Sequence, residues 1–335
     1  MKPHSTQKSP VFTRRRHLAA LSGLMFVPLL SACGWSRDLP IAVAAHVWVG
    51  YEPMFMARDR GWLDAAQVVL HETHTAVESV AALRASKVQA AALTLDEVLA
   101  ARASGLDLAV VLVFNVSMGA DMLLARPDIH QLAQLKGERI GYEASSVAEV
   151  MLAEILKRAG LVRQDVRLVK IAIDEHMTAW QQHGVEALIT YEPVATQLMD
   201  QGMVRLFDSQ QIPDTIVDVL AVRRDVLDGA HAKALKHLVA GHFRALDHLT
   251  RNPQDASYRM APHLNLPPKE VLSAFKGLIQ PTPTHNHRLL AGDKPQLQPI
   301  AQRIAGILRN AGLITPQADG LDIINGAYLP SQGTP

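Results

Sequence analysis

The amino-acid sequence predicts an α/β fold of two lobes. At 335 residues the chain is longer than one ordinary hydrophobic core accommodates, which suits two domains or lobes. Strand-length apolar runs alternate with amphipathic helix-length stretches, and beyond about residue 224 the pattern becomes helical. Such alternation is typical of α/β proteins with mainly parallel sheets. We therefore expect two mainly parallel-stranded lobes that are completed by C-terminal helices.

The expected strands follow one another through the α/β part of the chain. They lie at 40–46, 66–71, 87–93, 107–115, 120–126, 138–143, 166–172, 185–190, 203–207 and 216–223. Three helix starts between them carry a capping box, in which a hydroxyl and a carboxylate each satisfy a free backbone N–H. The capping pairs are Thr75 with Glu78, Thr94 with Glu97, and Ser146 with Glu149.

The remaining part of the chain is expected to be helical. Helices are predicted at 230–251, 253–262, 268–279 and 295–310. Proline-rich breaks at 267–268 and 281–283 separate the later ones, because proline does not continue a helix. Residues 313–335 contain several Gly and Pro residues and are expected to form a loosely packed tail.

The charge distribution argues against a nucleic-acid partner. The formal net charge is +1, but Lys2, Lys8, Arg14, Arg15 and Arg16 all precede residue 33, in a segment without any acid. The rest of the chain is therefore mildly acidic. A basic surface of the kind that binds nucleic acid is not expected.

Residues 1–32 predict an export signal peptide. A basic segment ends at 14–17, an apolar run that is short for a membrane span follows at 18–30, and small residues precede Cys33. These are the three parts of a secretory signal. Cys33 is the only cysteine, so it cannot form an internal disulfide. The Leu-Ser-Ala-Cys box at 30–33 resembles the bacterial lipoprotein signal, which implies lipidation of Cys33, a tether at 33–39 and anchoring to a membrane.

Two alternatives for this segment stay open. Cys33 could be a free, buried cysteine behind an ordinary signal peptide. The arginine run at 14–16 also resembles a twin-arginine export signal, although residues 16–18 are only a loose match to the residues expected after the arginine pair. Both alternatives keep export as the expectation and differ in anchoring or in route.

A Tyr-Glu-Pro motif occurs twice at comparable places. Residues 51–53 follow the first expected strand, and residues 191–193 follow a strand much later in the chain. In both cases the Tyr-Glu pair lies between the carboxyl end of a strand and the start of a helix. Ligands of open α/β sheets bind at that edge, so two such edges facing each other would form a cleft.

Several short motifs resemble one family by their order and spacing. They are Gly50-Tyr51-Glu52-Pro53 with residues 57–61, residues 90–97, residues 117–121, Leu135-Lys136-Gly137 leading to Ile140-Gly141-Tyr142-Glu143, Tyr191-Glu192-Pro193, and residues 207–209 with 217–219. The chain resembles the nitrate/sulfonate/taurine and thiamine-precursor (NMT1/THI5-like) group of substrate-binding proteins of ABC importers. The resemblance implies a type II periplasmic-binding-protein fold, in which two α/β lobes joined by two crossing strands close around a ligand by hinge motion.

The resemblance also implies a domain layout and partners. Lobe one is expected at 38–115 plus 222–312, and lobe two at 122–215. The crossings are expected near 114–125 and 213–222. The implied partners are a small-molecule ligand and the permease and ATPase subunits of an ABC importer, and we expect the protein to be a monomer.

Acidic residues dominate the expected cleft. The side chains predicted to bind the ligand are Trp48, Tyr51, Glu52, Thr94, Asp96, Ser117, Asp121, Glu143, Tyr191, Glu192 and Asp218. Converging carboxylates repel one another and are costly to desolvate unless a positive or donor-rich group lies between them. This pattern favours an amine, an amidine or an aminopyrimidine-like ligand. Trp48 and Tyr51 would offer flat faces for stacking or for a cation–π contact.

Each acidic residue also has a structural alternative. Glu52, Asp96 and Glu192 lie at helix starts, where acids stabilise the helix N-terminus. Asp121 and Asp218 could instead hold the crossing strands in place. The partial positive charge of helix N-termini favours anions, so a nitrate-, sulfonate- or taurine-type ligand stays open.

No cofactor, metal site or enzymatic activity is expected. His71 and His74 lack the i, i+4 spacing of a helical zinc pair, and residues 285–287 are predicted to be a loop. We find no Gly-x-Ser-x-Gly, P-loop or Gly-x-Gly-x-x-Gly motif and no cysteine after Cys33. The resemblance extends to a pyrimidine-synthesising enzyme that acts inside the cell, and the export signal argues against that alternative. A sensory or chaperone-like envelope protein could use the same fold.

Overall fold

A computed structural model describes residues 38–227, 229–315 and 322–331 of the chain. The predicted signal peptide, Cys33 and most of the tether lie outside the described residues. Among those that are described, no helix has both the length and the apolar character that a membrane crossing requires.

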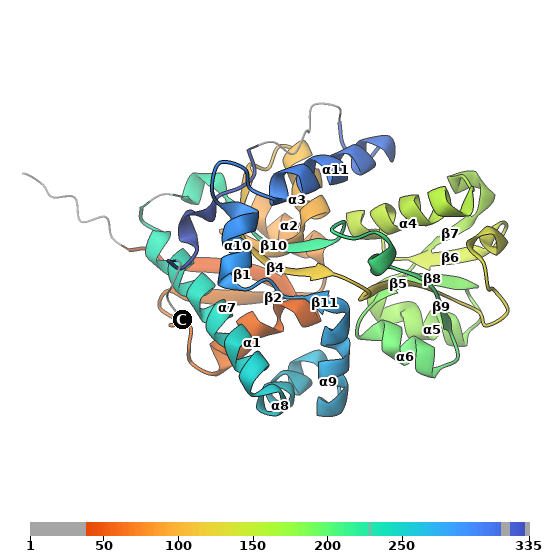
Figure 1. Cartoon of the computed structure of the whole chain (residues 1–335), viewed down its shortest axis with the longest axis horizontal. Coiled ribbons are helices and arrows are strands. Elements are labelled where there is room, and N and C mark those ends of the chain that lie inside the picture. Colours follow the sequence, from red (N-terminus) through yellow and green to blue (C-terminus); the bar gives the residue numbers. More distant parts are fainter. Residues whose placement is uncertain (1–37, 228, 316–321, 332–335) are drawn as a thin grey trace, which may run out of the picture. The chain divides into compact units, whose positions relative to one another are not determined.

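Two β-sheets organise the described residues (Figure 1). The six-stranded sheet has the order β11-β4-β10-β3-β1-β2, and we call it with its helices lobe one; the five-stranded sheet has the order β7-β6-β8-β5-β9, and we call it with its helices lobe two. The strands are β1 Ile41–His46, β2 Val68–Thr73, β3 Ala90–Thr94, β4 Leu108–Ser117, β5 Asp121–Ala125, β6 Arg139–Tyr142, β7 Arg167–Lys170, β8 Ala187–Tyr191, β9 Val204–Asp208, β10 Val217–Arg223 and β11 Leu278–Ile279. The helices are α1 Glu52–Asp59, α2 Ala76–Arg84, α3 Leu95–Ala103, α4 Ser146–Ala159, α5 His176–Gln181, α6 Val194–Asp200, α7 Ala232–Arg251, α8 Pro253–Leu264, α9 Pro268–Ala274, α10 Pro283–Leu290 and α11 Leu297–Asn310.

The prediction of an α/β fold is confirmed, but the sheets are mixed rather than mainly parallel. Strands β1, β2 and β3 are parallel, as are β6, β7 and β8. Strand β10 pairs antiparallel with both β3 and β4, and β5 pairs antiparallel with both β8 and β9. Both β5 and β10 follow a crossing from the other sheet. Each therefore enters its new sheet from the edge at which the parallel strands end.

The chain crosses between the sheets twice, at 118–120 and at 209–216. The two crossings are joined by Ser209, whose hydroxyl lies 2.8 Å from Ser117 Oγ and accepts a hydrogen bond from the Gly119 N–H (2.6 Å). All three groups are buried. The crossing segments are thus held to each other at the point where the lobes meet.

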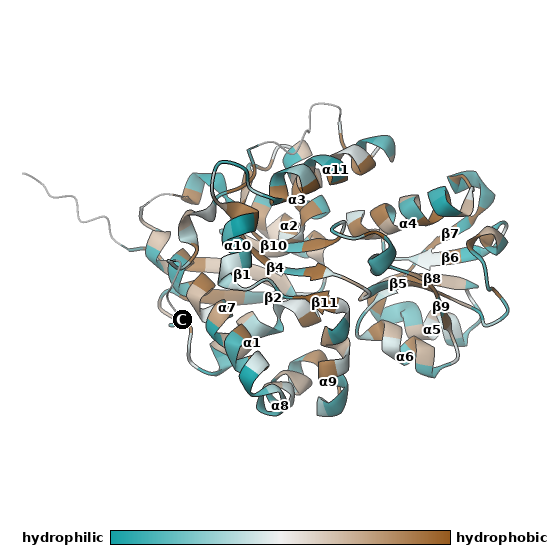
Figure 2. Ribbon diagram, viewed as in Figure 1, coloured by the Kyte–Doolittle hydropathy of each residue, from teal (hydrophilic) through white to brown (hydrophobic). Residues whose placement is uncertain are grey.

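Lobe two is packed on both faces of its sheet. Successive residues of a strand point to opposite faces, and in β5 Leu123 and Ala125 join the hydrophobic cluster that contains Ile155 of α4. Met122 and Leu124 instead join the cluster that contains Leu198 of α6. Figure 2 shows hydrophobic residues along the strands and alternating hydropathy along the covering helices. Strands buried on both faces are continuous apolar runs, which is why the sequence locates them well.

The C-terminal region corrects two predictions. The helix predicted at 268–279 ends at Ala274, and 278–279 form the short strand β11 beside β4. The loop predicted at 285–287 lies within α10, which begins at Pro283 after Thr282, whose hydroxyl accepts the His285 N–H (3.3 Å). A hydroxyl cap followed by proline is a helix-start signal.

Asn286 of α10 explains why a helix lies beside β4. Its Oδ1 accepts the Val113 N–H (2.8 Å), and its Nδ2 donates to the carbonyls of Val113 (3.1 Å) and Pro281 (3.2 Å). Strand β11 is only two residues long and pairs with Ser117 and Val116. The buried amide therefore serves Val113 as a neighbouring strand would, because buried backbone groups require partners.

We expect Asn286→Ala to destabilise the protein. The substitution leaves the buried N–H and C=O of Val113 without this partner, which costs about 2 kcal/mol or more of unfolding free energy. Urea unfolding followed by circular dichroism measures the loss. His285→Ala, at an exposed position on the same helix, is the control. Equal midpoints for the two variants would contradict the assigned role of Asn286.

Candidate functional site

The two sheets bring the ends of their parallel strands to a common region. In lobe one, Asp218 at the start of β10 is paired with Thr94 at the end of β3. In lobe two, Asp121 at the start of β5 is paired with Tyr191 at the end of β8. The antiparallel entry of the crossing strands therefore places an aspartate beside the carboxyl edge of each sheet, where ligands of α/β proteins bind.

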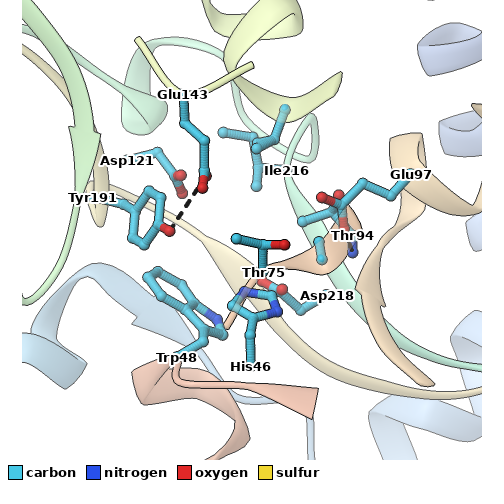
Figure 3. A pocket seen from close by; sticks show the side chains of 12 residues that line it. His46, Trp48, Thr75, Thr94, Glu97, Asp121, Glu143, Tyr191, Ile216 and Asp218 are labelled. Atoms are coloured by element: carbon cyan, nitrogen blue, oxygen red, sulfur yellow. Dashed lines mark hydrogen bonds between the residues drawn. The ribbon is translucent and has the colours of Figure 1, made fainter. Parts of the chain in front are cut away.

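A pocket lies between these edges (Figure 3). It encloses about 440 Å³ of space, part of which is open to solvent. Side chains from both lobes and from the second crossing line it. They are His46, Trp48, Thr75, Ala76, Thr94, Glu97, Asp121, Glu143, Val147, Tyr191, Ile216 and Asp218. A second hollow of about 630 Å³, also open to solvent, adjoins the pocket and shares Thr75, Ala76 and Glu143 with it.

Part of the site predicted from sequence is brought together here. The predicted residues that line the pocket are Trp48, Thr94, Asp121, Glu143, Tyr191 and Asp218. The rings of Trp48 and Tyr191 meet edge to face, with their centroids 5.5 Å apart, so the two lobes are in contact at the pocket wall. That these six residues bind a ligand stays a prediction.

Three further predicted residues lie behind the lining. The Tyr51 hydroxyl donates to Asp218 Oδ1 (2.6 Å) and is fully buried. The Ser117 hydroxyl accepts the Asp121 N–H (3.3 Å). Asp96 accepts from the Ser146 hydroxyl of α4 (2.5 Å), which joins the two lobes. These residues position lining groups or contact the opposite lobe.

The structure does not place Glu52 or Glu192 among the pocket-lining residues. Glu52 is the first residue of α1 and is 1% exposed. Its Oε1 lies 2.5 Å from Nδ1 of His263 on α8. Glu192 accepts the N–H (3.2 Å) and hydroxyl (2.9 Å) of Thr196 at the start of α6. Glu192 therefore contacts the start of α6, in line with its structural alternative, whereas the contact of Glu52 with His263 was not anticipated. That either acid binds a ligand stays a prediction.

Sequence reasoning did not select three polar lining residues. Thr75 and Glu97 were assigned to capping boxes, and His46 was not among the predicted ligand-binding residues. The Glu97 carboxylate does accept the Thr94 N–H (2.9 Å), and Thr75 accepts the Glu78 N–H (3.2 Å). The signal that could have identified them was their position at or within three residues of the carboxyl ends of β1, β2 and β3, since these strand ends form the edge of the pocket.

The third capping prediction is displaced by one residue. Ser145 rather than Ser146 caps α4, and its hydroxyl accepts the Ala148 N–H (3.4 Å). Ser146 is the first residue of the helix. Its hydroxyl is therefore available for the contact with Asp96 across the lobes.

The pocket disfavours negative charge on its own acids. Burial raises the pKa of Glu97 to about 8 and that of Asp121 to about 7, with neighbouring carboxylates contributing in the same direction. Burial also raises the pKa of Asp218 well above its usual range and raises that of Glu143. His46 has its pKa lowered by burial to about 4, so it is neutral at neutral pH. Among the described residues no Lys or Arg lines this pocket.

Several buried polar atoms around the pocket have no hydrogen-bond partner among the described residues. They are His46 Nδ1, Trp48 Nε1, Thr94 Oγ1, Asp121 Oδ2 and Asp218 Oδ2. Buried polar atoms of folded proteins are satisfied with few exceptions. Their concentration at one pocket indicates a place where another molecule supplies the partners.

The family of the chain follows from a family model that matches residues 48–256 and carries the description NMT1/THI5 like. The chain belongs to the NMT1/THI5-like family. The match begins at Trp48 and extends into α8, so it includes the pocket residues of both lobes apart from His46.

Curated relatives align over part of their length. A Brucella abortus protein named only as a binding protein is 25% identical over 140 residues, which are 41% of this chain and 44% of the relative. An Escherichia coli K12 protein named for aliphatic sulfonates is 26% identical over 186 residues, 54% of this chain and 57% of that one. The chain thus spans about half the length of the relatives that it matches.

Solved structures show the fold of this NMT1/THI5-like chain. The alkanesulfonate-binding protein SsuA from Xanthomonas axonopodis pv. citri, bound to MOPS, superposes with a TM-score of 0.70 at 17% identity, covering 84% of this chain and 96% of that one. The periplasmic aliphatic sulphonate-binding SsuA from Escherichia coli gives 0.70 at 19% identity, with 86% and 98% covered. The expectation of a two-lobed periplasmic-binding-protein fold is confirmed.

Proposed function

We propose that the protein is the solute-binding component of an ABC-type importer and captures a small polar, cationic or donor-rich molecule between its lobes. The observation that carries this proposal is the pocket between the sheets, to which Glu97, Asp121, Glu143 and Asp218 contribute carboxyl groups. Amine, amidine and aminopyrimidine-like molecules are the ligand class. Hinge closure adds the contacts of the second lobe to those of the first, so the ligand favours the closed state.

The electrostatics support a cation over an anion. A cationic ligand would compensate buried carboxylates that are otherwise costly to ionise. An anion would meet the same carboxylates without a lysine or arginine among the described lining residues. The sulfonates named for the relatives favour the second candidate, an anion binder, and the N-termini of α2 and α4 near the pocket would assist it.

Two probes that share a ring and differ in charge separate these candidates. We expect benzamidine to raise the melting temperature and to bind at least about tenfold more tightly than benzenesulfonate. Isothermal titration at pH 8 and a thermal-shift series measure both. Tighter binding of benzenesulfonate would replace the proposal with the anion binder. Mass spectrometry of molecules released from natively purified protein then identifies the natural ligand.

The proposed role requires no bond chemistry. The chain has no cysteine after Cys33, and the pocket acids lie among aromatic and apolar walls suited to enclosing a ligand. The proposed partners are the permease and ATPase subunits, which would recognise the closed form, and the proposed oligomeric state is a monomer. Incubating the protein with the natural ligand and then measuring the mass of that ligand would detect an enzyme, because turnover would change the mass. An unchanged mass after prolonged incubation is the expected result.

We further propose export and lipid anchoring through Cys33, and expect Cys33→Ser to move the protein from the membrane fraction to the soluble fraction of the cell envelope. A lipid-modified cysteine partitions into the bilayer through its acyl chains, whereas serine cannot carry that modification. Cell fractionation and intact-mass measurement check the result. Ser31→Ala, which keeps small residues before the cysteine, is the control. Wild-type protein of unmodified mass in the soluble fraction would contradict the anchor.

A further inference from the structure

The four acids of the pocket differ in how their oxygens are used. Glu97 is held by the Thr94 N–H (2.9 Å), and Glu143 is contacted by the Tyr191 hydroxyl (3.5 Å). Asp218 accepts the Tyr51 hydroxyl at Oδ1 (2.6 Å), but its Oδ2 and the Oδ2 of Asp121 are buried acceptors without a hydrogen bond among the described residues. Each of the two aspartates therefore keeps one buried oxygen for an external donor.

These two aspartates occupy equivalent places in the two lobes. Asp121 begins β5 directly after the first crossing, and Asp218 is the second residue of β10, which follows the second crossing. Their exposed fractions are 6% and 2%. The Asp121 carboxylate also raises the pKa of Asp218 through charge repulsion. Figure 3 shows both carboxyl groups beside the space that the pocket encloses.

We infer that the ligand is a planar cation of the amidinium type, with N–H donors on two nitrogens. One nitrogen donates to Asp121 and the other donates to Asp218. The inference rests on the proposed function and specifies its ligand class. Two charge-assisted hydrogen bonds, one to each carboxyl group, would give Asp121 Oδ2 and Asp218 Oδ2 the donors that they lack. An ammonium also has several N–H donors, but they radiate from one nitrogen, whereas an amidinium presents donors on two nitrogens in one plane.

Two non-acidic side chains support a planar ligand in the same place. Trp48 Nε1 and Thr94 Oγ1 are buried polar atoms that make no well-formed hydrogen bond among the described residues, although Trp48 lies beside Asp218 and Thr94 beside Glu97. Their side chains are 5% and 8% exposed. The Trp48 indole and the Tyr191 ring form an aromatic corner of the pocket. A flat cation can lie against an aromatic face while its edge donates hydrogen bonds.

This arrangement couples the ligand to closure. Because Asp121 belongs to lobe two and Asp218 to lobe one, a ligand that bonds both joins the lobes directly. A ligand that hydrogen-bonds only one of the two aspartates contacts one lobe strongly, so closure of the lobes adds less to its binding free energy. Tryptophan fluorescence reports the difference, since Trp48 lines the pocket.

Benzamidine and benzylamine test the inference. They share a ring and a single positive charge, but benzamidine has N–H donors on two nitrogens and benzylamine has them on one. We expect benzamidine to bind wild-type protein at least about tenfold more tightly, and Asp121→Asn and Asp218→Asn each to weaken benzamidine by at least about tenfold. Benzylamine is expected to lose a comparable factor in one of the two variants only. Titration calorimetry and the Trp48 signal measure these constants, with exposed Asp200→Asn as the control.

The results distinguish the planar two-nitrogen ligand of this inference from the cation-binding pocket of the proposed function. The two-nitrogen ligand is overturned if benzylamine binds as tightly as benzamidine, or if its affinity falls equally in both variants. Either result leaves the proposal of a cation-binding pocket in place. Failure of both cations to bind overturns the cation-binding pocket as well. Thermal unfolding at pH 8 checks that the two Asn variants are folded, and we expect neither to melt far below wild type, because asparagine matches aspartate in shape and cannot ionise in the buried site.

Discussion

We expect the pocket acids of the ligand-free protein to lower its stability as the pH rises from about 4.5, the usual range of unfolded carboxyl groups, to about 8. The pKa of Glu97 is raised to about 8 and that of Asp121 to about 7. Over this interval the folded state keeps protons that the unfolded state has released. Stability falls with pH wherever the folded state binds more protons, so the loss continues until both carboxyls have ionised.

The buried histidines act in the opposite direction at lower pH. Burial lowers the pKa of His46 and His176 to about 4 and that of His242 to about 3. Below about 6.5 the unfolded state binds protons that these rings do not take up when folded. Their contribution to stability therefore decreases as the pH falls. The two effects together predict maximal stability in mildly acidic solution.

Thermal unfolding across a buffer series from pH 5 to pH 9 measures this profile. Glu97→Gln is expected to flatten the alkaline decline, because an amide can still accept the Thr94 N–H but has no proton to lose. Asp293→Asn, at an exposed position, is expected to leave the profile unchanged. A melting temperature that rises steadily toward pH 8.5 in wild-type protein would show that the pocket acids are ionised without penalty.

Saturating benzamidine is expected to remove the alkaline decline. A cation stabilises the ionised form of the surrounding carboxylates, so its affinity rises with pH as Asp121 and Glu97 lose their protons. Binding near pH 7 then releases protons into the buffer. Calorimetry in two buffers of different ionisation enthalpy measures that release, and an absence of buffer dependence would contradict proton-linked binding.

The second large effect is expected for Ser146→Ala, which removes a bond between the lobes. The Ser146 hydroxyl of α4 donates to Asp96 at the start of α3 (2.5 Å), and Asp96 is fully buried. Val150 of the same helix is 1% exposed and belongs to the hydrophobic cluster of lobe one. Losing a donor to a buried carboxyl costs about 1–3 kcal/mol, and this cost arises only in the closed arrangement.

Small-angle X-ray scattering and ligand titration check this expectation. Ser146→Ala is expected to increase the radius of gyration of the ligand-free protein and to weaken benzamidine by about tenfold, since part of the binding free energy is then used for closure. Ser145→Ala removes the cap of α4 and no contact with lobe one, so it is expected to lower the melting temperature without changing the radius. Identical scattering for Ser146→Ala and wild type would contradict the role of this contact in closure.

The fold could be predicted because most strands are buried on both faces. Runs such as the one that becomes β4, which is buried along its whole length, are visible as continuous apolar segments. The predicted helix-start signals are retained at Thr75 and in the Thr94 and Glu97 pair, whereas the third cap is Ser145 and not the predicted Ser146. Strand direction was less accessible. The antiparallel entry of β5 and β10 depends on which lobe each crossing reaches, and this is a property of the folded chain.

The positions of site residues along the chain could be predicted, but the direction in which each side chain points could not. Asp96 and Glu97 are adjacent at the start of α3, yet Glu97 lines the pocket while Asp96 contacts Ser146. Successive helical residues differ by about 100° around the axis, so one position changes what a carboxyl group meets. Glu52 shows the same effect, since its partner His263 lies on a helix more than two hundred residues later.

Asn286 could not be identified locally for a related reason. Its sequence neighbours are polar and lie among prolines, and its role depends on Val113 of β4. Val113 pairs with Val219 of β10 on one side, but the two-residue β11 does not reach it on the other side. This open side explains why one helix position supplies both a donor and an acceptor, and neither β4 nor α10 shows it in isolation.

Ser209 limits how the lobes can move. Because its hydroxyl bonds the first crossing at Ser117 and Gly119 while its backbone belongs to the second, the two connections cannot slide along each other without breaking buried bonds. We therefore expect relative motion of the lobes to be mainly a rotation at this junction. In the proposed role, a permease that touches both lobes would then distinguish ligand-bound from ligand-free protein by the angle between them.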